Sequence, residues 1–78
     1  MLLLVETMPG PHGDLQPCGF KLGEAQLTVL QIVDRWIGQD QNYFKLQASD
    51  NALYILRHNL VPDTWELTLF QSTPAGLA

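Results

Sequence analysis

Residues 43–70 consist of three runs rich in aromatic and branched residues, separated by two polar breaks at 49–51 and 59–64. Apolar and polar positions alternate within each run. Runs of this kind, bounded by Asp, Asn, Ser and Pro, are typical of strands joined by hairpins. The pattern therefore predicts an antiparallel β-meander over this part of the chain.

The first break sets the register of the first hairpin. Ser-Asp-Asn suits a three-residue turn in which Asn51 adopts the left-handed conformation. Phe44 then faces Leu56, and Leu46 faces Tyr54. Because side chains alternate along a strand, these residues share one face. A two-residue turn would divide the same apolar set between two faces, so we predict the first register.

The second hairpin aligns when Leu56 is placed opposite Leu67. The reverse face then receives a pair of opposite charges, worth roughly 0.2–1 kcal/mol. Three further cross-strand pairs are predicted by this alignment: Tyr54 with Leu69, His58 with Trp65, and Arg57 with Glu66.

The reverse face of the meander is not purely polar. A sheet covered on one side should carry polar residues on the other, and burying a large apolar side chain is worth roughly 1.5–3 kcal/mol. Residues 2–5 are predicted to form an edge strand that covers only part of this face. We therefore expect a partner to bind the rest, through Tyr43, Leu53, Ile55 and Phe70.

Residues 25–37 fit two interpretations. As a helix, the apolar residues from Ala25 to Trp36 form an amphipathic stripe. As a strand, the alternation slips near Gln31, which a β-bulge would explain. We favour the bulged strand, because the run is rich in Val, Ile, Thr and Trp and has no N-cap residue.

Prolines and glycines interrupt residues 7–19, which are predicted to form a mobile loop. A short strand over residues 20–22 follows, with a turn at Gly23, and the tail at 71–78 is predicted to be mobile. The chain is then one all-β domain over residues 1–78, a small antiparallel meander of five or six strands rolled into a partial barrel. Both tryptophans should be buried, and the predicted core is Val29, Ile32, Phe44, Leu46, Tyr54, Leu56, Trp65, Leu67 and Leu69.

Composition points to association with another protein. A domain of 78 residues gains only about 3–5 kcal/mol from its core, and a single cysteine excludes an internal disulfide. Charged residues are 15% of the chain, against about 25% in ordinary domains. We therefore predict a small protein-interaction module that acts as a homodimer or as a subunit of a partner complex.

The charge of the chain argues against two other classes of partner. The net charge is −4, and the four basic residues are scattered, so no basic stripe is present to bind nucleic acid independently. The apolar start of the chain is too short to cross a membrane. The lone thiol fits a cytoplasmic location.

Few residues suggest chemistry. His12, Asp14 and Cys18 are potential metal ligands, but their spacing matches no zinc pattern, so no metal or other cofactor is expected. Cys18 as a nucleophile would need a base placed by the fold. No phosphate-binding loop or nucleophile motif occurs, and the chain is not expected to be an enzyme.

A second hypothesis concerns polar residues near predicted strand ends. Asp34 could pair with Arg57 or His58, either as a salt bridge that fixes the corner of the sheet or as part of a site. The alternative function is therefore a small-ligand or nucleic-acid accessory domain, with Arg35, Trp36, Arg57 and His58 as possible ligand-binding residues.

Four short motifs carry a resemblance: Asp-Arg-Trp at 34–36, Tyr-Phe at 43–44, Tyr-x-Leu-Arg-His at 54–58 and Trp-x-Leu at 65–67. In this pattern, which extends over residues 5–70, the chain resembles a group of small uncharacterised bacterial all-β proteins. The resemblance implies a compact β domain and supports the strand at 25–37. Some members are encoded near lesion-bypass DNA polymerases. The resemblance implies no catalytic residue, and this chain is less basic than the group.

Overall fold

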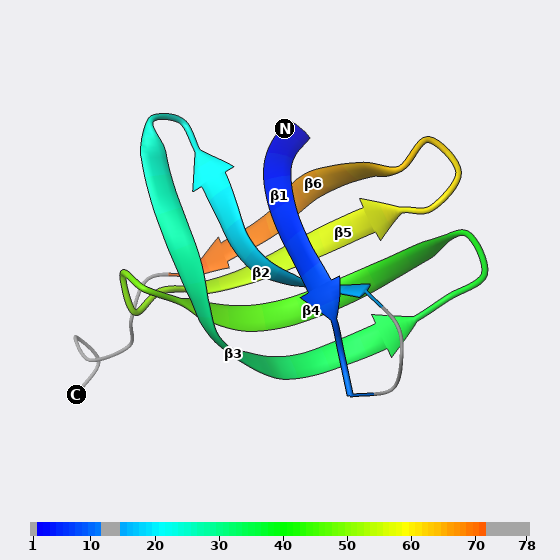
Figure 1. Cartoon of the computed structure of the whole chain (residues 1–78), viewed down its shortest axis with the longest axis horizontal. Coiled ribbons are helices and arrows are strands. Elements are labelled where there is room, and N and C mark those ends of the chain that lie inside the picture. Colours follow the sequence, from blue (N-terminus) through cyan, green and yellow to red (C-terminus); the bar gives the residue numbers. More distant parts are fainter. Residues whose placement is uncertain (1, 12–14, 72–78) are drawn as a thin grey trace.

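The protein is described by a computed structural model that covers residues 2–11 and 15–71. Within these residues the chain forms six strands and no helix (Figure 1). Each strand pairs antiparallel with the next, and the last returns to the first to close a barrel. The predicted all-β meander is confirmed, and the barrel is closed rather than partial. The strands are β1 (Leu2–Pro9), β2 (Leu15–Leu22), β3 (Ala25–Ile37), β4 (Gln41–Ala48), β5 (Leu53–Asn59) and β6 (Thr64–Gln71).

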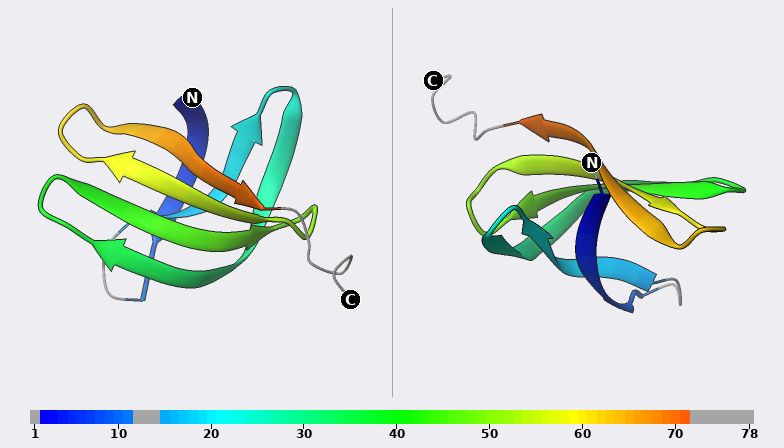
Figure 2. Two further views of the ribbon diagram at one scale, coloured as in Figure 1. Left: turned by 180° about the vertical axis from the view of Figure 1, so that it is seen from behind. Right: turned by 90° about the horizontal axis from the view of Figure 1, so that it is seen from above.

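The long strand β3 belongs to both halves of the barrel. Its first part pairs with β2 as far as Thr28, and from Val29 onward it pairs with β4. Figure 2 shows the bend between these two parts. The register shifts between Val29 and Gln31, and again between Ile32 and Asp34. The predicted bulged strand is confirmed, and the helical interpretation is wrong.

The hairpin between β4 and β5 has the predicted register. Phe44 pairs with Leu56 and Leu46 with Tyr54, and all four side chains are buried. The turn contains Asn51 with a φ of 69°. This left-handed conformation is one that Asn tolerates better than most residues, so the turn chemistry and the apolar alternation specify the same pairing.

The hairpin between β5 and β6 follows the prediction over only half its length. The pairs Leu56–Leu67, Arg57–Glu66 and His58–Trp65 are present. The predicted pair of Tyr54 with Leu69 is wrong, because the register shifts between Ile55 and Leu56. Leu69 pairs with Ile55 instead, and the side chain of Leu69 is half exposed rather than part of the core.

The predicted loop over residues 7–19 is wrong in its described part. β1 continues to Pro9, and β2 begins at Leu15. Pro17 has no backbone N–H to donate to a neighbouring strand. It is accommodated in β2 because the pairing with β1 shifts register beside it, between Glu6 and Thr7, and a hydrogen bond is not required at such an irregular position. Of the residues predicted to be mobile, 12–14 and 72–78 lie outside the described residues, whereas Gln71 is the last residue of β6.

The core lies between the two halves of the barrel. Phe20 of β2 is fully buried and packs edge-on against Tyr54, with ring centroids 5.0 Å apart. This residue was not among the predicted core, whereas Val29, Ile32 and Leu67 are only partly buried. The buried hydrophobic residues are Leu3, Phe20, Leu27, Phe44, Leu46, Ala48, Ala52, Tyr54, Leu56 and Trp65.

Candidate functional site

Cross-strand pairing defines an outer face on the sheet formed by β3, β4, β5 and β6. Residues directly opposite each other project from the same side of a sheet. One row across this sheet joins Trp36, Tyr43, Arg57 and Glu66, and the next joins Asp34, Lys45, Ile55 and Leu69. With Leu53, which lies beside Ile55 on the same side of β5, these residues are called the outer face below.

The predicted partner-binding residues are largely on this face. Tyr43, Leu53 and Ile55 occupy it and are half-buried by their neighbours. The backbone of Phe70 pairs with Tyr54, and its side chain lies outside the described residues. Leu69 takes the position opposite Ile55 that the predicted register gave to Thr68, and Gln71 takes the position opposite Leu53 that it gave to Phe70. Because β1 closes the barrel beside β6 and places Leu3 in the core, it does not cover the outer face as predicted.

The four residues of the second predicted site are divided between the two sides of the sheet. Arg35 pairs with the buried Phe44, and His58 pairs with the buried Trp65. Trp36 and Arg57 belong to the outer face. Trp36 is 46% exposed, so its predicted burial is wrong, whereas Trp65 is 6% exposed, as predicted.

Arg57 is held by an acidic neighbour across the sheet. It donates a hydrogen bond to Oε1 of Glu66, and the amide of Asn59 donates to the same oxygen at 3.0 Å. The hydrogen bond from Arg57, followed by the one from Asn59, holds the pKa of Glu66 below its ordinary value. Neither predicted pair of Asp34 is found; its Oδ1 accepts a hydrogen bond from the backbone N–H of Arg35 at 2.8 Å.

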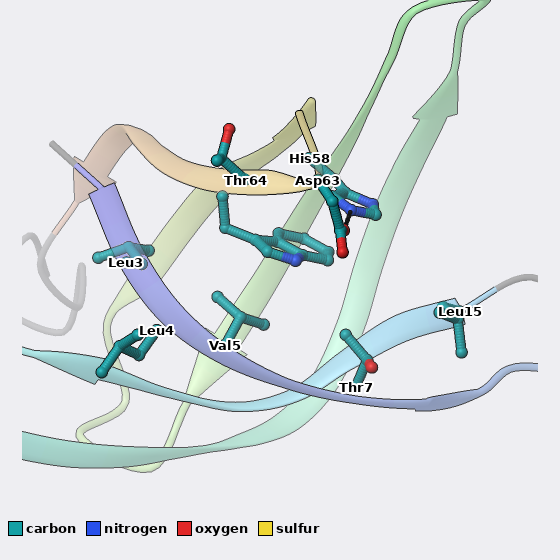
Figure 3. A pocket seen from close by; sticks show the side chains of 9 residues that line it. Leu3, Leu4, Val5, Thr7, Leu15, His58, Asp63 and Thr64 are labelled. Atoms are coloured by element: carbon teal, nitrogen blue, oxygen red, sulfur yellow. Dashed lines mark hydrogen bonds and ion pairs between the residues drawn. The ribbon is translucent and has the colours of Figure 1, made fainter. Parts of the chain in front are cut away.

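A groove opens where β1 leaves β6. Among the described residues these strands pair at Leu2 with Glu66 and at Leu3 with Trp65 and nowhere else, and β1 then continues beside β2. The groove has a volume of about 440 Å³. Figure 3 shows Leu3, Val5 and Thr7 of β1 along one side, with His58 and Asp63 on the other.

His58 is a buried polar residue of the groove. Its ring stacks on Trp65, with centroids 4.1 Å apart and planes inclined by 2°. Its Nε2 lies 2.8 Å from Oδ1 of Asp63. Asp63 belongs to the polar break at 59–64 and was not among the predicted site residues. The sequence offered one indication that Asp63 lies near His58. Asp63 lies in the polar break between His58 and Trp65, two residues that the predicted register places opposite each other.

The described residues contain no group of three His, Cys, Asp or Glu side chains placed to hold a metal ion. Cys18 is a free, half-buried thiol, while His12 and Asp14 lie outside the described residues. In residues 2–11 and 15–71 there is no helix of the length and apolarity needed to cross a membrane.

Comparison with known proteins gives no relative. No protein-family model matches the chain, and neither curated proteins nor solved structures contain a match. The resemblance to the group of small bacterial proteins therefore stays a prediction, and a function has to be argued from the outer face and the groove.

Proposed function

We propose that the protein is a protein-interaction module that forms a homodimer through the outer face. The observation that carries this proposal is the exposure of large apolar side chains on and beside that face. Trp36 and Leu69 are each about half exposed, and Val33, at the second register shift of β3, is 48% exposed. An apolar surface of this kind is typical of a protein contact.

Charge favours a second copy of the chain as the occupant. The outer face carries two acidic and two basic residues, which are Asp34, Glu66, Lys45 and Arg57. Removing them from the chain's eight acidic and four basic residues leaves six acidic and two basic, so the whole net charge of −4 lies elsewhere. Two acidic copies repel each other least at a neutral face. Because this face carries charges of both signs, an acidic residue of one copy can also pair with a basic residue of the other copy across a two-fold axis.

The free side of β3 supports contact through side chains rather than through strand pairing. Within residues 2–11 and 15–71, β3 pairs with β4 from Val29 onward and no longer with β2. An unpaired strand edge normally invites another strand, and bulges are one device that prevents it. The two register shifts in this part of β3 disturb its edge while leaving Leu30 and Val33 exposed.

The test is sedimentation equilibrium at micromolar concentration. Wild type should have the mass of a dimer, and Leu69→Lys should have the mass of a monomer that keeps the β-sheet circular dichroism of wild type. Val61→Lys is the matched control, because Val61 is 86% exposed in the turn between β5 and β6; this variant should stay dimeric. A wild type that is monomeric at these concentrations, or a dimeric Leu69→Lys, would overturn the proposal.

The alternative of a nucleic-acid accessory domain gains no support from the geometry, because Arg35 and Arg57 lie on opposite sides of the sheet and Arg57 is paired with Glu66. We expect the dimer to act in the cytoplasm and without catalysis. The first expectation rests on the single thiol, and the second on the lack of a nucleophile motif in the sequence.

A further inference from the structure

We propose that the groove between β1 and the β5–β6 hairpin binds an organic cation, a primary ammonium or guanidinium group carried on an apolar stem. The groove is a separate site from the outer face. His58 and Trp65 project toward the inside of the barrel, so a dimer formed through the outer face would leave the groove open. The inference therefore does not depend on the proposed homodimer.

The carboxylate of Asp63 is the expected cation-binding group. Its Oδ1 contacts Nε2 of His58, yet the Asp63 side chain is 81% exposed. Most of the carboxylate is thus open to a ligand. Among the described residues that line the groove there is no lysine or arginine; the ring of His58 is the ion-pair partner of Asp63 there, and a ligand cation would bind the remaining, exposed part of the carboxylate.

This carboxylate is also held in place before any ligand binds. Asp63 has a φ of 55°, a left-handed conformation that is uncommon outside glycine. Its partner His58 is buried and fixed by stacking on Trp65. A group already ordered by such contacts loses little conformational freedom when it binds a ligand.

The rest of the groove suits an apolar stem. Leu3, Val5 and Leu15 provide aliphatic walls, and Leu4 at the rim is 75% exposed. Methylene chains of cationic groups pack on apolar surface while the charged end stays with polar partners. The volume of about 440 Å³ lies in the range of small-ligand sites, about 300–1,000 Å³.

Charge excludes the opposite class of ligand. A carboxylate or phosphate would meet Asp63 directly and would also approach a protein with a net charge of −4. The same field raises the local concentration of cations. The site is therefore expected to discriminate between two ligands of equal stem length and opposite charge.

The first experiment titrates isotope-labelled protein with n-butylammonium and, separately, with butyrate, and follows the resonances of Val5, Leu15 and the His58 ring. Butylammonium should shift these resonances saturably in the millimolar range, and the shift should weaken with added salt. Butyrate should not. Equal binding of both compounds, or no shift of groove resonances with butylammonium, would overturn the proposal.

Variants identify the binding group. Asp63→Asn removes the charge but keeps a residue that tolerates the left-handed conformation and can bond to His58, and it should weaken butylammonium binding about tenfold or more. Glu24→Gln, in the exposed β2–β3 turn, removes the same charge elsewhere and should bind like wild type. Unchanged affinity in Asp63→Asn would contradict the proposal.

A second variant guards against a folding defect in Asp63→Asn. Thr7→Lys places a tethered ammonium in the groove from an exposed position of β1, and it should abolish binding of butylammonium while the fold is retained. Undiminished binding would count against the site. Finally, a lysine-containing hexapeptide is compared with the same peptide carrying glutamine. If the lysine peptide binds more tightly than butylammonium, the natural ligand is a side chain of another protein. If the two bind with similar affinity, the natural ligand is a free amine.

Discussion

Tyr54 and Asp50 are joined across the β4–β5 turn by a short hydrogen bond, in which the Tyr54 hydroxyl donates to Oδ2 of Asp50 at 2.6 Å. The other oxygen of Asp50 accepts from the backbone N–H of Ala52 at 3.0 Å. One carboxylate therefore fixes both the turn and a buried core tyrosine. Burial, with the hydrogen bond to Asp50 as the second cause, raises the pKa of Tyr54 above its ordinary value of 10.0.

This raised pKa predicts a loss of stability in alkali. The native state keeps the Tyr54 proton at a pH where the unfolded chain has begun to lose it, so the stabilisation is complete below pH 10.0 and declines as the pH rises toward the folded-state pKa. The unfolding free energy of wild type, measured by urea denaturation, should fall above this pH. Tyr54→Phe should fall less steeply, and equal slopes would contradict the prediction.

The Arg57–Glu66 pair predicts the opposite dependence in acid. The pKa of Glu66 is lowered, mainly by the hydrogen bond from Arg57, so its stabilisation is present above the ordinary value of 4.5 and is lost as the pH falls through the folded-state pKa. Urea midpoints of wild type and Glu66→Gln should therefore converge in acid. Glu24→Gln, in the exposed turn, serves as the control that should keep the wild-type acid dependence.

The two tryptophans should respond differently to truncation. Trp65 is buried between His58 and Phe44, with ring centroids 4.1 Å and 5.7 Å away, so Trp65→Ala should lose about 3–5 kcal/mol of stability. Trp36→Ala, at a half-exposed position, should lose less than about 1 kcal/mol. Chemical denaturation followed by circular dichroism measures both, and similar losses would show that Trp36 is a core residue.

The burial of Trp36 was mispredicted because β3 contains two register shifts, while the sequence indicated one. After a single slip near Gln31, alternation would place Ile32 and Trp36 on the same inward side. The second shift, between Ile32 and Asp34, turns Arg35 inward and Trp36 outward. Val33 looks like an ordinary strand residue, so apolar periodicity alone does not reveal this second bulge.

Local pairing was predictable, whereas barrel closure was not. The β4–β5 register follows from a short turn and from alternation within one hairpin, both of which the sequence displays. The groove depends on Leu3 meeting Trp65 from the other end of the chain and on β1 continuing past that contact. No periodicity within either strand specifies such a distant pairing, so the groove became visible only in three dimensions.

The register shift in β6 has a hydrogen bond of its own. Ile55 pairs with Leu69 and Leu56 with Leu67, which leaves Thr68 as the extra residue. Its Oγ1 donates to the carbonyl of Ile55 at 2.9 Å. This bond satisfies a backbone acceptor at a point where the regular ladder is interrupted. The hydroxyl thus helps to place Leu69, rather than Thr68 itself, opposite Ile55 on the outer face.

Thr68→Val tests this role of the hydroxyl. The change keeps the size and branching of the side chain but removes the donor, and it should lower the unfolding free energy by about 0.5–1.5 kcal/mol. Thr28→Val, also at an exposed strand position, is the control and should be neutral or slightly stabilising, because valine favours strands. Equal effects of the two substitutions in urea denaturation would show that the hydrogen bond to Ile55 does not stabilise the bulge. A larger loss in Thr68→Val, accompanied by weaker dimerisation, would tie the bulge to the surface that Leu69 completes.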